Sequence, residues 1–142
     1  MFLNLPSSTD ESVQLSDGST RLFDIDAFEA YTITGSSGDD EIIAETGDDV
    51  IYGGAGNDTI NGNEFADDLY GGAQDDTLNG GSGLDELFGG GGSDVLNGGA
   101  SSDQLTGGGG ADTFQFTVTG GIDRITDWQD GIDLLDFTAD GL

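Results

Sequence analysis

Aspartate is the residue most able to do chemistry in this chain, because it recurs at one position of a nine-residue period. Residues 35–115 divide into nine consecutive blocks, and the sixth position of every block is aspartate. These residues are Asp40, Asp49, Asp58, Asp67, Asp76, Asp85, Asp94, Asp103 and Asp112. Glycosidic catalysis by carboxylates needs a single pair of groups. A ladder of nine therefore indicates repeated binding of cations.

The residue types around the aspartates favour calcium, and several ions of it. Calcium takes about six to eight oxygen ligands at about 2.3–2.6 Å in forgiving geometry, and glycine-rich turns leave backbone carbonyls free to supply them. Magnesium demands a tighter octahedron. Zinc prefers nitrogen and sulfur ligands, but the chain contains no histidine and no cysteine. No EF-hand loop motif occurs in the sequence.

The rest of each block predicts the elements that position these aspartates. The eighth position is always a large apolar residue, so we expect positions seven to nine to form a short strand with one inward side chain. Positions one to six, rich in glycine, are expected to form a turn. Two blocks then make one coil with a strand on each side. The inward residues are Ile42, Ile51, Ile60, Leu69, Leu78, Leu87, Leu96, Leu105 and Phe114.

Stacking of such coils would gather the aspartates into two columns, because each position recurs on the same side every 18 residues. The first column holds Asp40, Asp58, Asp76, Asp94 and Asp112, and the second holds Asp49, Asp67, Asp85 and Asp103. Adjacent strands lie about 4.8 Å apart, so these carboxylates repel one another unless a cation lies between them. The gaps within the columns predict at most about seven calcium ions.

The predicted sites are not equivalent, because some blocks depart from the pattern. The glycine of the fourth position is replaced in three blocks, by Phe65, Gln74 and Ser101. The second block begins Ala44-Glu45 in place of two glycines. Most departures fall in the second column, which we expect to bind more weakly, and the firmest site is expected between Asp94 and Asp112. Glu45 could add a ligand or be a solvated surface glutamate.

The blocks resemble the G-G-x-G-x-D-x-U-x repeats of RTX (hemolysin-type calcium-binding) proteins. The clearest examples are GGAGNDTIN at 53–61, GGSGLDELF at 80–88, GGGGSDVLN at 89–97 and GGGGADTFQ at 107–115. This resemblance implies an all-β fold, a right-handed parallel β-roll of about 4–5 coils. It also implies a secreted, extracellular protein exported by a type I system.

The chain is expected to divide into a leader and cap at 1–34, the repeat array at 35–115 and a capping segment at 116–142. Residues 13–23 are predicted to form a hairpin that turns at Asp17-Gly18. Ile33 lies nine residues before Ile42, so 32–34 is expected to be a first rung without a calcium turn.

The C-terminal segment resembles the end of RTX arrays in serralysin-type proteases, through the runs DRITDW at 123–128 and DGIDLLDF at 130–137. The resemblance implies that Asp123 and Asp127 are further calcium ligands; ordinary turn aspartates are the alternative. Trp128 is expected to belong to the cap core rather than to a sugar-stacking platform. Apolar residues expected to close the array are Ile122, Ile125, Trp128, Ile132, Leu134 and Phe137.

Composition excludes several function classes. The 142 residues, enough for one domain, carry 29 acidic residues against only Arg21 and Arg124, for a net charge of −27. Nucleic acid is therefore not an expected partner, since nothing neutralises its phosphates. No apolar run is long enough for a membrane span. Without His, Cys or Lys the usual activated nucleophiles are missing, so we do not expect an enzyme.

These features together predict a calcium-binding module that is disordered without calcium, because one buried apolar residue per block cannot offset the ordering of a glycine-rich backbone. Such a module would support folding of an extracellular bacterial protein after type I secretion. The alternative is a calcium-dependent carbohydrate-binding or adhesive module. A preceding functional domain and a polysaccharide are the other candidate partners.

Overall fold

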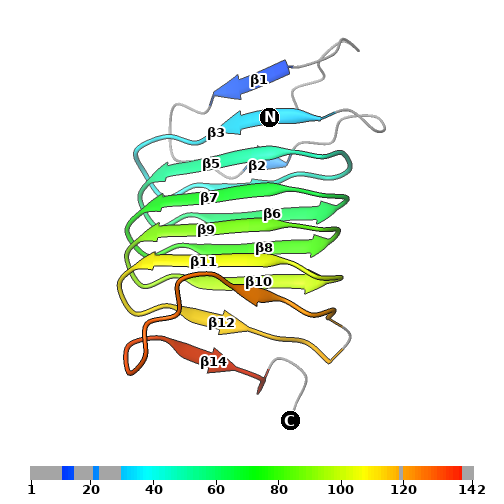
Figure 1. The fold of residues 1–142 in the computed structure, drawn as a ribbon. Coiled ribbons are helices and arrows are strands. Elements are labelled where there is room, and N and C mark those ends of the chain that lie inside the picture. Colours follow the sequence, from blue (N-terminus) through cyan, green and yellow to red (C-terminus); the bar gives the residue numbers. More distant parts are fainter. Residues whose placement is uncertain (1–10, 15–20, 23–29, 119, 139–142) are drawn as a thin grey trace.

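Two parallel sheets of seven strands each form a flattened solenoid, and the chain alternates between them (Figure 1). The structure, a computed structural model, describes residues 11–14, 21–22, 30–118 and 120–138. Sheet A contains, in spatial order, β1 (Glu11–Gln14), β3 (Tyr31–Thr34), β5 (Val50–Ala55), β7 (Asp68–Ala73), β9 (Glu86–Gly91), β11 (Gln104–Gly109) and β13 (Arg124–Ile125). Sheet B contains β2 (Arg21–Leu22), β4 (Glu41–Ile43), β6 (Thr59–Glu64), β8 (Thr77–Ser82), β10 (Val95–Ala100), β12 (Thr113–Gln115) and β14 (Leu134–Asp136).

The register of the repeat strands confirms the all-β parallel roll and its 18-residue period. Leu69 lies opposite Ile51 and Leu87 in sheet A, and the eighth positions of sheet B align in the same way. All nine eighth-position side chains are buried in one hydrophobic core between the sheets. The solenoid has about six turns, because strands from both flanks extend the sheets beyond the repeats. Within the described residues, no helix has the length and apolar character to cross a membrane.

The repeat strands are longer than expected, and the prediction that positions one to six form a turn is wrong. β5 to β11 each have six residues and continue through the first three positions of the next block. The second glycine adopts a φ of +116° at Gly72 and +112° at Gly90, so it bends the strand without ending the ladder. A Cβ at Gly72 would lie 2.2 Å from the carbonyl oxygen of Gly54, which explains why glycine is needed there.

The N-terminal flank continues the solenoid instead of folding as a hairpin. β1 pairs in parallel with β3 in sheet A, whereas β2 pairs in parallel with β4 in sheet B. The predicted turn at Asp17-Gly18 and most of the predicted leader and cap lie outside the described residues. The expected rung at 32–34 is present, because Ile33 is buried opposite Ile51, but it is not the first, since β1 precedes it in sheet A.

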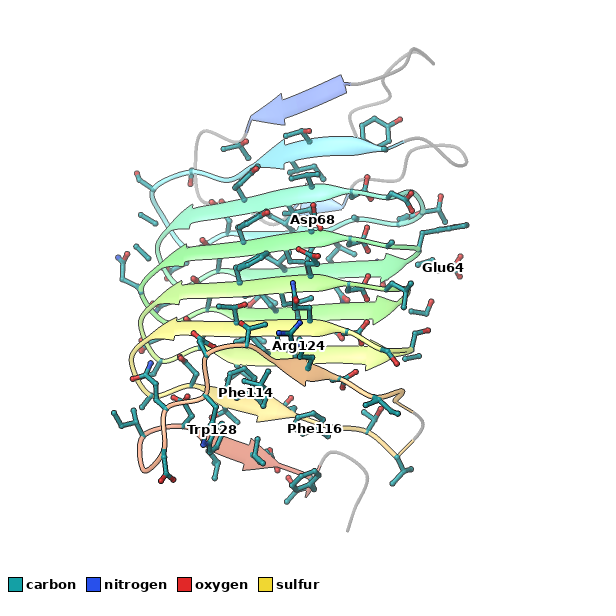
Figure 2. The ribbon with its side chains drawn as sticks, viewed as in Figure 1. Glu64, Asp68, Phe114, Phe116, Arg124 and Trp128 are labelled. Atoms are coloured by element: carbon teal, nitrogen blue, oxygen red, sulfur yellow. The ribbon has the colours of Figure 1, made fainter. Side chains whose placement is uncertain are left out.

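The C-terminal flank adds one strand to each sheet but leaves most of its apolar side chains exposed. Ile125 aligns with Leu105 and packs partly against the core. Trp128 lies beside Phe114, with ring centroids 6.2 Å apart (Figure 2). The exposed apolar residues of this segment are Val118, Ile122, Trp128, Ile132, Leu134, Leu135 and Phe137.

The core predicts a large difference between two leucines of one block. Leu87 is fully buried and Leu84 is 66% exposed. With calcium present, Leu87→Ala should lower the free energy of unfolding by about 2–5 kcal/mol, because it leaves a cavity between the sheets. Leu84→Ala should stay within about 0.5 kcal/mol of the parent. Urea denaturation measures both, and equal effects would contradict the assigned register.

Candidate metal centre

The nine aspartates lie in two columns at the turns that enter the strands. In the first column, at the turns entering sheet B, the backbone N–H of Asp58 donates to Oδ1 of Asp76 at 2.8 Å, and that of Asp76 donates to Oδ1 of Asp94 at 2.9 Å. In the second column, at the turns entering sheet A, Asp67 donates in the same way to Asp85 at 2.9 Å. The 18-residue spacing therefore brings the aspartates together as the repeat predicts.

Each column carries buried carboxylate oxygens without a protein partner. All nine aspartates are at most 3% exposed, although a buried carboxylate is costly unless its oxygens are paired. One oxygen usually accepts the backbone N–H described above, and the other has no hydrogen bond. The unpartnered atoms are Oδ1 of Asp40 and Oδ2 of Asp58, Asp67, Asp76, Asp85, Asp94, Asp103 and Asp112.

The first glycine of a block, present in every block but the one that begins with Ala44, makes room for these free oxygens. A Cβ at Gly89 would lie 2.4 Å from Oδ2 of Asp94 and 2.6 Å from the carbonyl oxygen of Gly107. The corresponding distances at Gly71 are 2.5 Å to Oδ2 of Asp76 and 2.6 Å to the carbonyl oxygen of Gly89. A carboxylate oxygen from one coil and a carbonyl oxygen from the next thus share one side of the glycine, where no side chain can enter.

Burial raises the pKa of eight of these nine carboxyl groups above the ordinary aspartate value. The pKa of Asp67 is raised to about 8 and that of Asp76 to about 7, while those of Asp49, Asp85 and Asp94 are raised to about 6. The backbone N–H bond lowers each pKa, and neighbouring carboxylates raise it again. Ionised aspartates in these columns therefore need a compensating positive charge.

The donor set fits a hard cation held between coils. Among the described residues, no three acidic side chains come close enough to hold a metal by themselves. A site here must combine a carboxylate oxygen with backbone carbonyls, which suits the many-oxygen, flexible coordination of calcium. The imidazole and thiolate ligands that zinc prefers are missing, because the sequence has no histidine and no cysteine.

Comparison with known protein families identifies the cation that the array binds. The family model of the RTX calcium-binding nonapeptide repeat matches the chain in four copies, at residues 34–69, 54–87, 61–96 and 80–114. The chain belongs to this RTX family. Comparison with curated proteins gives no match. The matched residues include all nine aspartates of the two columns, so the RTX array is a calcium-binding module.

The RTX columns continue beyond the matched residues. Oδ1 of Asp123 accepts the backbone N–H of Asp103 at 3.1 Å, so Asp123 extends the second column. Oδ1 of Asp133 accepts the N–H of Asp112 at 3.2 Å and extends the first. Asp133 was not predicted; its signal is the D-x-U spacing to Leu135, which aligns with Phe114.

Asp127 lies outside both columns. Its two carboxylate oxygens accept the backbone N–H groups of Gly107 and Gly108 at 3.0 and 2.7 Å. The carboxylate therefore holds the glycine pair of β11 against the C-terminal segment. Its expected role as a calcium ligand stays a prediction, as does that of Asp123.

The irregular RTX blocks bend the backbone where glycine is missing. Positive φ values occur at Asn63 (75°), Phe65 (78°), Gln74 (77°) and Ser101 (94°), a conformation that side chains other than glycine resist. Phe65 and Ser101 lie in turns that enter sheet A, beside the second column, and Asn63 lies near the end of β6 in the same block as Phe65. Glu45 lines a surface hollow there with Thr46, Asn63, Glu64 and Ser82.

The raised pKa values predict an unusual pH dependence for the RTX array in the absence of calcium. The folded state binds protons more tightly than the unfolded chain, so the stabilisation is complete near pH 4 and is lost as the pH rises through about 6 to 8. Circular dichroism of decalcified protein should therefore show more β-structure at pH 4.5 than at pH 8.5. Light scattering controls for precipitation near the isoelectric point of about 4.1. Stability that increases with pH over this range would contradict the prediction.

Proposed function

We propose that this RTX chain is a module that folds when calcium binds to its two aspartate columns. The observation that supports it is the series of buried carboxylate oxygens without a protein partner at eight of the nine column aspartates. Repulsion and desolvation along each column oppose folding, and calcium relieves both. The binding free energy of the ions then appears as folding free energy. The RTX solenoid is a structural calcium-binding fold, and we assign it no reaction.

The proposed sites lie in the gaps within each column, about seven between the repeats. Each would take a carboxylate oxygen of aspartate and carbonyl oxygens of the glycine-rich turns. Two further gaps, between Asp103 and Asp123 and between Asp112 and Asp133, have the same backbone-to-carboxylate contact. The second column is proposed to be weaker, because most of the strained non-glycine turn residues lie beside it.

Coupled folding suits a protein that is exported unfolded. RTX membership suggests type I secretion, and low calcium inside the cell would keep the chain unfolded before export. Millimolar calcium outside would then shift the equilibrium to the folded state by mass action. The chain has no cysteine, so disulfides cannot stabilise the extracellular fold. We propose that the module serves in this way a larger extracellular protein with a preceding functional domain.

Calcium-dependent binding of polysaccharide is the alternative function. The arrangement of the aromatic side chains on sheet A gives it little support. A sugar stacks on the face of an aromatic ring. On sheet A both faces of Tyr70 are covered, by Tyr52 and Phe88. Titration with alginate and with neutral glycans at fixed calcium separates this function from folding alone.

Removal of calcium should unfold the repeat region. In EDTA the β-sheet signal in circular dichroism is expected to be lost, since the carboxylates again repel one another, and excess calcium should restore it. Calorimetric titration should give a stoichiometry of about seven ions or slightly more. A full β-sheet signal in EDTA at pH 7.5 would contradict the proposal.

Replacing one column aspartate should weaken calcium-induced folding far more than an equal change of charge at the surface. Asp94 is fully buried, and its Oδ2 is free. We expect Asp94→Asn to raise the calcium concentration at half-folding by about tenfold or more, equivalent to at least about 1.4 kcal/mol. The matched control is Asp130→Asn at an exposed position, which should change it less than about twofold. Similar shifts in both variants would show that net charge alone matters.

A further inference from the structure

Three aromatic side chains form a stacked ladder on the outer face of sheet A, which faces the viewer in Figure 1. Tyr52, Tyr70 and Phe88 come from β5, β7 and β9. Their ring centroids are 4.7 and 4.8 Å apart, with interplanar angles of 13° and 3°. The register places Thr34 before the ladder and Thr106 after it, so it has three rungs and defined ends.

The ladder is bordered on one side by carboxylates and on the other by bare backbone. Asp68 and Glu86 are strand partners two residues before the ladder positions, and Figure 2 shows Asp68 on this face. On the other side Gly54, Gly72 and Gly90 are aligned and exposed. A Cβ at Gly72 or Gly90 would lie 2.2 Å from a carbonyl oxygen of the preceding coil, so this strip stays flat.

Asp68 and Glu86 lie on the same face of sheet A as the rings, because residues two apart in a strand point to the same side. The pKa of Tyr70 is raised by partial burial, then by the charges of Asp68, Tyr52 and Glu86. The phenol edges and the carboxylates therefore share one surface. Together with the net charge of −27, this surface attracts cations and repels anions.

The shape of the ladder limits what can bind to it. The rings cover one another's faces, and their edges point to solvent beside the flat glycine strip. A molecule must be long and flat to contact all three rungs at once, and apolar enough to gain from covering the ring edges. Positive charge would add attraction to Asp68 and Glu86.

We propose that the ladder on sheet A is a binding site for elongated, planar aromatic molecules that carry positive charge. The site requires the folded sheet, but its rings come from the third residues of β5, β7 and β9, and none of its residues is a column aspartate. The inference rests on the proposed function to the extent that calcium folds the sheet, and it would stand even if fewer than seven ions bind.

Thioflavin T, a planar cationic aromatic dye, tests this site on the full chain at saturating calcium. Its fluorescence should rise saturably with protein concentration. Tyr70→Thr, which introduces the residue found at both ends of the ladder, should lower the affinity by about tenfold. Asn79→Thr changes the equivalent position of sheet B and should leave the affinity unchanged. Circular dichroism verifies that both variants fold, and equal affinity for Tyr70→Thr and the parent overturns the proposal.

Two further variants test charge selection and location. The double substitution Asp68→Asn with Glu86→Gln should weaken binding of the dye several-fold and reduce its salt dependence; an unchanged affinity overturns the charge requirement and with it the proposal. Phe137→Thr removes an exposed aromatic residue of the C-terminal segment and should have no effect. Loss of binding in this variant alone would assign the dye to that segment and overturn the site on sheet A. An anionic dye, 8-anilinonaphthalene-1-sulfonate, should not compete with thioflavin T.

Discussion

Crowding of buried carboxylates is the constraint on which this solenoid depends. Every column aspartate except Asp40 uses one oxygen to accept a backbone N–H from the adjacent coil, as between Asp58 and Asp76, and so ties the coils together. Its other oxygen faces a space that only a glycine leaves open. The same carboxylates that align the coils therefore also leave uncompensated negative charge buried in the stack. A cation that accepts many oxygen ligands supplies the missing positive charge. The geometry of the columns is therefore consistent with membership of a calcium-binding repeat family.

The thin core explains why so much depends on these columns. Each repeat strand contributes one large apolar side chain, such as Leu69 or Leu78, to a single layer between the sheets. The remaining inward positions are glycines, which lose more conformational freedom on folding than other residues. Hydrophobic burial is therefore spread evenly and sparsely along the solenoid, and cohesion between coils rests on the parallel ladders and on the turns.

The nine-residue period was enough to predict the columns, the apolar layer and the parallel fold, because strand geometry leaves only one way to stack identical coils. It was not enough to predict strand length, since a Gly-Gly pair with positive φ looks like a turn in sequence although it continues the ladder. Asp133 was not predicted because it follows Asp112 by 21 residues, three more than the 18-residue period. The aromatic ladder was visible in principle, as Tyr52, Tyr70 and Phe88 recur every 18 residues.

The two outer faces of the roll differ, with aromatic rings on sheet A and asparagines such as Asn61 and Asn79 at the equivalent positions of sheet B. Since one block spans half a coil, an insertion or deletion of a single nonapeptide would transfer every downstream strand to the opposite sheet. The ladder would be broken and its rungs divided between both sides. Gain or loss of whole coils, in steps of 18 residues, is the only change in length that keeps each surface intact, so genes for such arrays should expand and contract by paired repeats.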